Sequence, residues 1–255
     1  MKRIIYLLPV AALLMGVQSC CCDKDDDNDS APVAAPAIQP NGDYAVDLGL
    51  SVKWATCNVG ANTPEEYGDY YAWGDTTTYY KPGYAQSEYP EWKVGKASYE
   101  WFNYKYCYAN FNDLTKYCNN SYYGFEGITD TLTILTPADD VAHYKWGGNW
   151  RMPTKADFDE LLNNCNCEFT TQNGVKGLKV TSRKDSSQSI FLPAAGFRRG
   201  TLLYGIGSRG YGYYWSSSLY TDGPSKACFL NFYSDDPCTN FDYRPYGYSV
   251  RPVCP

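Results

Sequence analysis

The chain has 255 residues, of which 44% are hydrophobic and 20% charged, so its length suits one domain with a tail and a hydrophobic core. Its formal net charge of −6 argues against a nucleic-acid partner, because the neutralisation of phosphates needs clustered Lys and Arg. His143 is the single histidine, which excludes metal sites that need several histidine ligands.

The first residues resemble a bacterial lipoprotein signal. Lys2 and Arg3 precede an apolar stretch at residues 4–16, which is too short to span a bilayer, since about 20 residues are needed. The sequence VQSC at residues 17–20 resembles a lipobox, and this resemblance implies cleavage before Cys20 and a lipid on its thiol. An ordinary cleaved signal with spare thiols is the alternative. We expect acyl chains on Cys20 to be the membrane anchor.

An acidic run and a linker follow the signal. Residues 23–29 hold five aspartates and one lysine, a composition typical of a solvated spacer. The KDD sequence at residues 24–26 also resembles the export signal of Bacteroidetes surface lipoproteins, which implies an outward-facing position on the outer membrane. We therefore expect a signal peptide at 1–19, a lipidated acidic and Pro/Ala-rich tether at 20–41, and a folded domain at 42–255.

The first half of the folded domain predicts little regular structure. Residues 44–57 mix β-branched and aromatic residues around Gly49, which predicts two short strands or one bent strand. Thr63, Pro64 and Glu66 form a helix-start pattern that predicts about one turn. Residues 67–125 hold 14 tyrosines and little periodicity, so we expect a loop-rich insertion ordered by aromatic packing.

Two helices are predicted next. Thr136 would cap the first, which runs to about Lys145 and ends at two glycines. Its predicted inner side consists of Val141, Ala142 and Tyr144. Thr154 would cap the second helix. Its apolar residues recur at helical spacing and are expected to face a core, which would bury the cysteine among them: Phe158, Leu161, Leu162 and Cys165.

The end of the chain predicts strands. Segments rich in β-branched and aromatic residues lie at 177–181, 189–192, 213–218, 227–232 and 248–253, with Gly- and Pro-containing turns between them. Two helices followed by a set of antiparallel strands are typical of an α+β domain.

Catalytic chemistry has little support in the sequence. A Ser–His–Asp site would need His143, which the pattern places on a helix surface beside Asp139 and Asp140. Paired carboxylates for glycoside cleavage stay open, because the fold sets their spacing. Asp235 and Asp236 could ligate a hard cation, although adjacent carboxylates are typical of a solvated turn. We therefore predict no enzyme, no cofactor and no metal site.

Six motifs, in order, resemble the Fibrobacter succinogenes major paralogous domain, a family abundant in Bacteroidetes surface proteins. They are WATCNVG at 54–60, YGDYYAWG at 67–74, WGGNWRMPT at 146–154, FLPAAG at 191–196, YWSSS at 214–218 and SVRPV at 249–253. The resemblance covers residues 44–254 and implies a relative of the C-type-lectin fold. That fold has two helices packed on twisted antiparallel sheets, paired terminal strands, and ligand loops at one end.

The resemblance also bears on cysteines and calcium. Cys57 and Cys254 would lie on the paired terminal strands, so a disulfide between them is expected in an oxidising compartment. Sugar-binding lectins of this fold hold calcium with a Glu-Pro-Asn or Gln-Pro-Asp loop. The nearest match, QPN at residues 39–41, lies in the tether, so calcium-dependent sugar binding is not predicted.

Residues 204–248 resemble the variable region found in some members of this fold, where diversity-generating retroelements rewrite the ligand loops by adenine-directed mutagenesis. Residue types that this mutagenesis produces crowd the segment. The resemblance implies that the following residues contact ligand: Tyr211, Tyr213, Tyr220, Asp222, Tyr233, Asp235, Asp236, Asn240, Asp242, Tyr243 and Tyr246. Tyr, Asn, Asp and Gly are also ordinary loop formers, so a fixed loop region is the alternative.

These features together predict a binding module, a lipid-anchored receptor or adhesin on the outer membrane. Its expected partner is a glycan or a surface protein of a host or bacterium, since tyrosine offers a large contact area at low side-chain entropy. We expect membrane contact through the lipid alone and no nucleic acid. A secreted carbohydrate-active enzyme and a structural subunit of a surface fibre or pilus tip are the alternatives.

Overall fold

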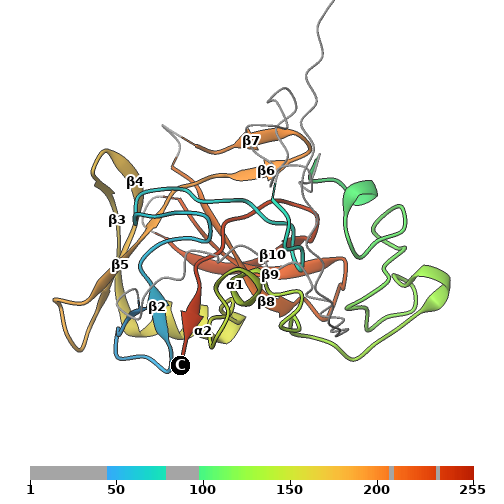
Figure 1. Cartoon of the computed structure of the whole chain (residues 1–255), viewed down its shortest axis with the longest axis horizontal. Coiled ribbons are helices and arrows are strands. Elements are labelled where there is room, and N and C mark those ends of the chain that lie inside the picture. Colours follow the sequence, from blue (N-terminus) through green and yellow to red (C-terminus); the bar gives the residue numbers. More distant parts are fainter. Residues whose placement is uncertain (1–44, 79–97, 207–209, 234–235) are drawn as a thin grey trace, which may run out of the picture. The chain divides into compact units, whose positions relative to one another are not determined.

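The computed structural model describes residues 45–78, 98–206, 210–233 and 236–255 (Figure 1). The chain divides into two units, Met1–Ala35 and Pro36–Pro255, and every described residue belongs to the second. Cys20 and the expected signal, acidic run and linker lie outside the described residues. The described part is an α+β fold with four antiparallel sheets, and none of its helices is long and apolar enough to cross a bilayer.

The two ends of the folded domain meet in one sheet. Strands β1 (Ala45–Val46) and β2 (Lys53–Ala55) are the two short strands expected around Gly49, which has a φ of 75°. Strand β11 (Val253–Cys254) pairs with β2 on its other side. The pairing of terminal strands implied by the resemblance is therefore present.

The prediction of a strand at residues 248–253 is mostly wrong. Apart from Val253 in β11, the segment makes single bridges to different neighbours, Tyr248 with Tyr71 and Ser249 with Tyr214. It crosses from the central sheet to the terminal sheet, so no partner strand runs beside it for long enough to form a ladder.

The central sheet has the order β10-β9-β8. It contains β8 (Gly212–Leu219), β9 (Lys226–Phe232) and β10 (Cys238–Tyr243), all antiparallel, with β10 at the edge. Strands β8 and β9 lie at the segments predicted from 213–218 and 227–232. The residues of β10 are mostly polar and exposed, so they lack the apolar pattern that predicts a strand.

Both faces of β8 and β9 are covered. Trp215 and Phe229 belong to one buried cluster, whereas Tyr214, Leu230 and Phe232 belong to another. Because side chains alternate along a strand, these two sets point to opposite faces. A strand that is buried on both sides reads as a nearly continuous apolar run, which is the pattern of β9.

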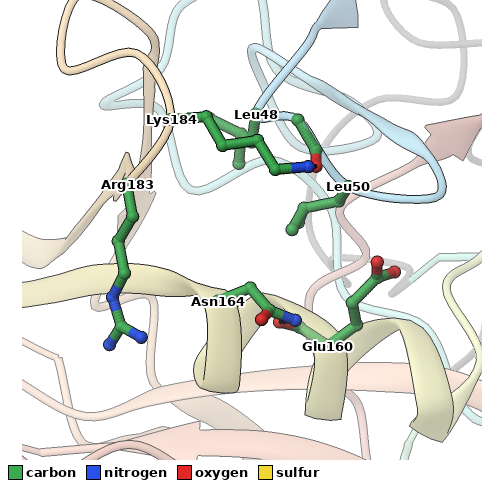
Figure 2. A pocket seen from close by; sticks show the side chains of 7 residues that line it. Leu48, Leu50, Glu160, Asn164, Arg183 and Lys184 are labelled. Atoms are coloured by element: carbon green, nitrogen blue, oxygen red, sulfur yellow. Dashed lines mark hydrogen bonds between the residues drawn. The ribbon is translucent and has the colours of Figure 1, made fainter.

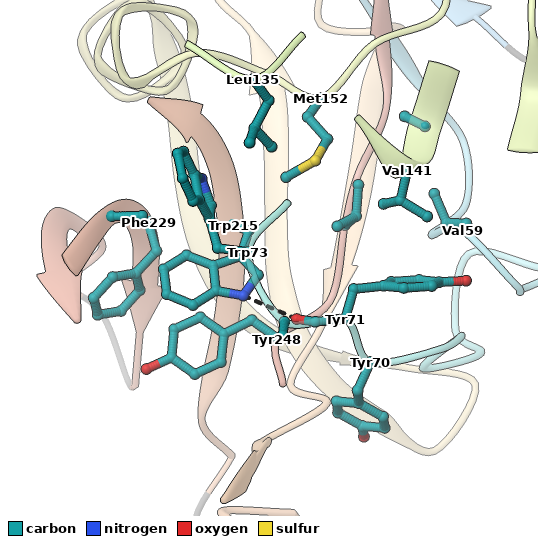
Figure 3. Close-up of a cluster of buried hydrophobic side chains, with 14 of the residues drawn as sticks. Val59, Tyr70, Tyr71, Trp73, Leu135, Val141, Met152, Trp215, Phe229 and Tyr248 are labelled. Carbon is teal, nitrogen blue, oxygen red and sulfur yellow. Dashed lines mark hydrogen bonds between the residues drawn. The ribbon is translucent and has the colours of Figure 1, made fainter. Parts of the chain in front are cut away.

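The first cluster is built mainly from aromatic rings (Figure 3). Trp215 stacks on Tyr248 with ring centroids 4.2 Å apart, and its indole N–H donates to the carbonyl oxygen of Tyr71 at 2.9 Å. Tyr99 and Tyr117, from the predicted insertion, are fully buried in the same cluster. This confirms, for the described residues, that aromatic packing orders the insertion.

The described part of the insertion is irregular. It holds the short 3-10 helices η3 (Trp101–Asn103) and η4 (Phe125–Gly127), and its residues 79–97 lie outside the described part. Upstream, Glu66 N donates to Thr63 O in a single turn, and no helix follows. The predicted helix start there is therefore a turn.

Helix α1 (Val141–Trp146) begins later than predicted. Asp139 N and Asp140 N both donate to Thr136 O, which makes a turn, and Asp140 then caps the helix. Ala142 and Trp146 are four residues apart and share the buried side, whereas Tyr144 is 63% exposed. The expected inward position of Tyr144 is wrong, because the helix starts five residues after Thr136. Gly147 ends the helix, as predicted.

Helix α2 (Lys155–Asn164) matches the prediction. The Thr154 side chain accepts from Asp157 N while the Asp157 carboxylate accepts from Thr154 N, so both parts of a capping box are present. Phe158, Leu161 and Cys165 are buried in the second cluster, and Leu162 packs against it. The helix packs on the central sheet and on β3.

The remaining strands form a second sheet and a hairpin. β3 (Cys165–Gln172), β4 (Val175–Ser182) and β5 (Ser189–Pro193) pair in that order, and β6 (Phe197–Arg199) pairs with β7 (Leu202–Tyr204). Only β4 and β5 were predicted. β3 is largely polar and half exposed, and β6 and β7 are too short to show a period.

Candidate functional site

Six of the predicted ligand-binding residues lie on or beside one face of the central sheet. We name this set the aromatic–acidic surface; it consists of Tyr211, Tyr213, Tyr233, Asn240, Asp242 and Tyr246. All six are exposed or partly exposed, and Tyr233 is 55% exposed. Two of its members, Tyr213 and Tyr246, pack against the buried cluster that contains Trp215 and Phe229.

Strand register brings these residues onto one face. Tyr213 lies opposite Asn231, and Asn231 lies opposite Cys238 on the edge strand. Asn240 and Asp242 follow Cys238 at intervals of two residues, so their side chains share its face. A sheet therefore joins residues that are about 30 positions apart in the chain.

Ring contacts fix the aromatic part of the surface. The Tyr211 ring lies 6.3 Å from that of Tyr213 and 5.5 Å from that of Tyr233. Tyr213 in turn stacks on buried Phe229, with ring centroids 5.8 Å apart. Burial, together with neighbouring Tyr211 and Asp242, raises the pKa of Tyr213, so its hydroxyl stays a hydrogen-bond donor at neutral pH.

The acidic part is oriented by the edge strand. Asp242 Oδ2 accepts from the Tyr248 hydroxyl at 2.6 Å, and its Oδ1 accepts from Tyr243 N at 2.7 Å. Asn240 Oδ1 accepts from Phe241 N at 2.8 Å. These side chains thus accept hydrogen bonds from two backbone N–H groups of the edge strand. Each of the oxygens keeps a second lone pair that can accept from a ligand.

Tyr220 and Tyr243 lie outside the aromatic–acidic surface, but the Tyr243 ring lies 6.0 Å from that of Tyr246 and borders it. On the other face of β10, Tyr220 stacks on Phe241 with centroids 3.9 Å apart. The Lys226 ammonium lies 5.0 Å from the Phe241 ring centroid and 5.3 Å from that of Tyr243. Trp101, from the insertion, lies 5.9 Å from the Tyr243 ring. The insertion therefore reaches the edge of the central sheet.

The remaining predicted contacts are scattered. Asp222 is exposed on the turn after β8, and Asp236 is exposed just before β10. Asp235 lies outside the described residues, so the suggested cation site at Asp235 and Asp236 is not described. No group of three or more His, Cys, Asp or Glu side chains that could hold a metal occurs within the described ranges.

Sequence reasoning missed several residues that border this region. Asn231 faces the aromatic–acidic surface, and its signal is one polar residue in an otherwise apolar strand. Phe197 lies 4.8 Å from Tyr213, and Arg199 lies 5.4 Å from the Tyr246 ring. These last two belong to a three-residue strand that no sequence period reveals.

The expected disulfide between Cys57 and Cys254 is absent, and both thiols are free. The terminal strands do pair, but the register places Cys254 opposite Lys53, four residues before Cys57. Strand β2 ends at Ala55, so Cys57 lies beyond the paired segment.

The carboxylates near His143 have structural partners. Asp140 caps α1 and accepts from Ala142 N, His143 N and Met152 N. Asp139 is also buried, and it accepts from the side chains of Lys105, Lys116, Tyr106, Tyr117 and Thr136. Both carboxylates are 4% exposed, whereas His143 itself, predicted on the helix surface, is partly exposed.

A cavity of about 340 Å³ lies between α2 and the turn at Leu48 to Leu50 (Figure 2). Most of its polar side chains already form hydrogen bonds within the chain. Glu160 accepts from the backbone N–H and hydroxyl of Ser51, and Lys184 donates to the carbonyl of Gly49. Arg183 donates to a backbone carbonyl and an amide on the other side. This cavity therefore offers a ligand few polar groups that lack a hydrogen-bond partner.

No family model, no curated protein and no solved structure matches the chain. The aromatic–acidic surface is the arrangement in the described part that suits ligand contact best. It combines flat rings with hydroxyl donors, one carboxylate and one amide, and it lies on a buried frame.

Proposed function

We propose that the chain is a surface-exposed ligand-binding module of the Fibrobacter succinogenes major paralogous domain family, with a C-type-lectin-like fold. The α+β architecture and the pairing of β2 with β11 support this proposal. In this function a lipid on Cys20 anchors the chain to the outer membrane, and the folded domain faces outward.

One observation carries the proposal. Within residues 204–248, Tyr214, Trp215 and Arg244 are fully buried, whereas Tyr233 and Asn240 are exposed and the rest of the aromatic–acidic surface is partly exposed. Substitutions at the exposed positions change contacts without removing core packing. Such a division suits a segment whose residues are diversified to bind different ligands.

The ligand is a glycan or a protein of a host or bacterial surface. Tyrosine rings pack on sugar rings or on protein side chains, and their hydroxyls add directional hydrogen bonds. Asp242 and Asn240 supply acceptors beside the rings. This composition resembles that of antibody contact surfaces, which are also rich in Tyr and Asn.

A binding screen tests the surface. Glycan and cell-surface protein arrays are probed with the wild-type chain and with Tyr233→Ala, whose side chain is 55% exposed. We expect the variant to lose about tenfold or more in affinity for every ligand found, as at a binding hot spot. Tyr122→Ala is the matched control, because Tyr122 is 69% exposed but belongs to the insertion. An equal loss of affinity in both variants, or no loss in either, would reject the aromatic–acidic surface as the binding site.

Sequencing tests the diversification separately. The locus is compared among sibling isolates, and the flanking DNA is searched for a near-copy of the codons for residues 204–248. Mismatches concentrated at template adenines are the expected result. Fixed codons without a near-copy would leave a binding module of constant specificity and overturn the diversification.

A further inference from the structure

A second cavity, of about 430 Å³, lies at the start of α1 and the turn that follows this helix, and Ser217 of β8 also lines it. Asn149, Trp150 and Arg151 line it and belong to the WGGNWRMPT motif of residues 146–154, which the proposed function does not use. Ile134 and Pro137 form an apolar wall. The volume falls in the lower part of the range of small-molecule sites.

The walls of this cavity are held in place before any ligand binds. The Trp150 ring packs edge-to-face on buried Trp146, with centroids 5.1 Å apart and an interplanar angle of 89°. The Asp140 carboxylate bonds Ala142 N at the helix start and Met152 N beyond the turn, which ties the two sides together. A preformed site loses little entropy on binding.

Polar groups line the cavity and have capacity to spare. His143 Nδ1 lies 3.3 Å from the Trp150 carbonyl oxygen, which can only accept, so Nδ1 is the donor of this contact and Nε2 is left for a ligand. Among the described residues, the Asn149 side chain and the Trp150 indole N–H have no hydrogen-bond partner. The cavity therefore offers one imidazole nitrogen, one indole donor and one amide that can both donate and accept.

The charged groups beside the cavity already have hydrogen-bond partners in the chain. The Arg151 guanidinium donates to Asp157 Oδ2 at 2.7 Å and to the Met152 carbonyl at 3.0 Å. The Asp140 carboxylate has no ion-pair partner among the described residues, but it is 4% exposed and accepts from three backbone N–H groups. Neither charge is open to an ionic ligand, so a neutral ligand with several hydroxyl groups fits this site better.

We propose that this cavity binds one neutral pyranose ring, with the C–H face of the sugar on the Trp150 and Ile134 side and its hydroxyls on His143 and Asn149. The site is separate from the aromatic–acidic surface and does not depend on it. The module would then carry a constant sugar site beside a surface whose specificity can change.

The test observes the indole N–H signal of Trp150 by NMR in the full chain. It is assigned with Trp150→Phe and titrated with D-glucose, D-galactose, D-mannose, L-fucose and N-acetyl-D-glucosamine. At least one sugar should shift this signal with a dissociation constant on the order of 1 mM, which is typical for so small a ligand. No shift with any of these sugars up to about 50 mM would overturn the proposal.

Variants then locate the binding. His143→Ala and Asn149→Ala should each weaken binding about tenfold. These side chains are half-buried and exposed, respectively, so the core is spared. Tyr144→Ala, one residue along α1 and 63% exposed, should bind as the wild type does. Unchanged binding in both cavity variants would overturn the site.

Tyr233→Ala separates this proposal from the proposed function. It should retain sugar binding in the cavity even where it loses the ligand of the aromatic–acidic surface. Sugar binding that is lost in Tyr233→Ala but kept in His143→Ala would place the sugar on the aromatic–acidic surface and reject the cavity.

Discussion

Arg244 and Arg251 are fully buried, and neither is paired with a carboxylate of the residues that the structure describes. Arg251 donates to the carbonyls of Ala55, Thr56 and Phe191 and to the amide oxygen of Asn58. A guanidinium can serve four acceptors in a plane, whereas an ammonium has three donors on one nitrogen. The arginine in the SVRPV motif thus ties three chain segments together.

Arg251→Lys should therefore be costly. We expect the free energy of unfolding to fall by about 2–4 kcal/mol, because buried carbonyls lose their donors and a charge stays in the interior. Urea denaturation at pH 7 measures the change. Arg183→Lys is the control, since Arg183 is exposed, and its change should stay within about 0.5 kcal/mol. Similar losses in both variants would contradict the role of Arg251.

Asp139 joins the insertion to the start of α1. Burial alone would raise the pKa of Asp139, but hydrogen bonds from Lys116, Tyr106, Tyr117 and Lys105 hold it below its usual range. A carboxyl whose pKa is lower in the folded chain stabilises the fold above its unfolded pKa of about 3.9. This contribution is lost as the pH falls below that value.

Asp139→Asn should lower the free energy of unfolding at pH 7 by about 2–4 kcal/mol. The gap between variant and wild type should narrow as the pH falls below about 4, because wild-type Asp139 then becomes protonated as well. Urea denaturation at a series of pH values measures this gap. Asp113→Asn, which removes a charge from an accessible site in the same insertion, serves as the control. A gap that is independent of pH would rule out the ionised carboxylate as the cause.

At the scale of elements, β10 is the exposed edge of the central sheet. An edge strand offers free N–H groups to other chains, and proteins protect such edges with polar side chains. Here the side chains of Asn240 and Asp242 accept from the N–H groups of Phe241 and Tyr243. Two predicted ligand-binding residues therefore also protect the edge.

The double substitution Asn240→Val and Asp242→Val should cause self-association. It frees both N–H groups and adds residues that favour strands, so β10 can pair with β10 of another copy. Light scattering after size-exclusion chromatography should show a mass that rises with concentration. The control exchanges the two residues, Asn240→Asp with Asp242→Asn, which keeps an acceptor at each position and should leave the mass unchanged. A double valine variant of constant mass would refute this role.

At the scale of the whole molecule, strand β11 joins segments that are far apart in the chain. Val253 is fully buried, pairs with Trp54, and exchanges two backbone hydrogen bonds with Arg151. The end of the chain thus completes the sheet that begins at residue 45 and supports the loop that leads into α2.

Deletion of residues 253–255 should lower the free energy of unfolding by about 3 kcal/mol or more, since a buried valine and a strand pairing are lost together. Chemical denaturation followed by circular dichroism measures the loss. Deletion of Pro255 alone is the control, because this residue is exposed. Equal denaturation midpoints for the two truncations would show that β11 contributes little.

Local features of the fold were predictable. Helix α2, its capping box and its buried stripe follow from residues within one or two turns, and the hydrogen bonds of the cap lie inside that window. Strands β8 and β9 were predictable as well, because apolar residues fill them on both faces. The start of α1 was not, since two capping groups, Thr136 and Asp140, compete within five residues.

The sequence by itself determined the α+β class and the position of α2, because composition and short-range periodicity encode these. Only the tertiary structure decided which tyrosines of residues 204–248 are accessible and that the Cys57 and Cys254 thiols are free. It also showed that Asn231 faces Tyr213. Strand register joins residues far apart in the chain, and a shift of one residue reverses every side chain, so no local pattern can encode it.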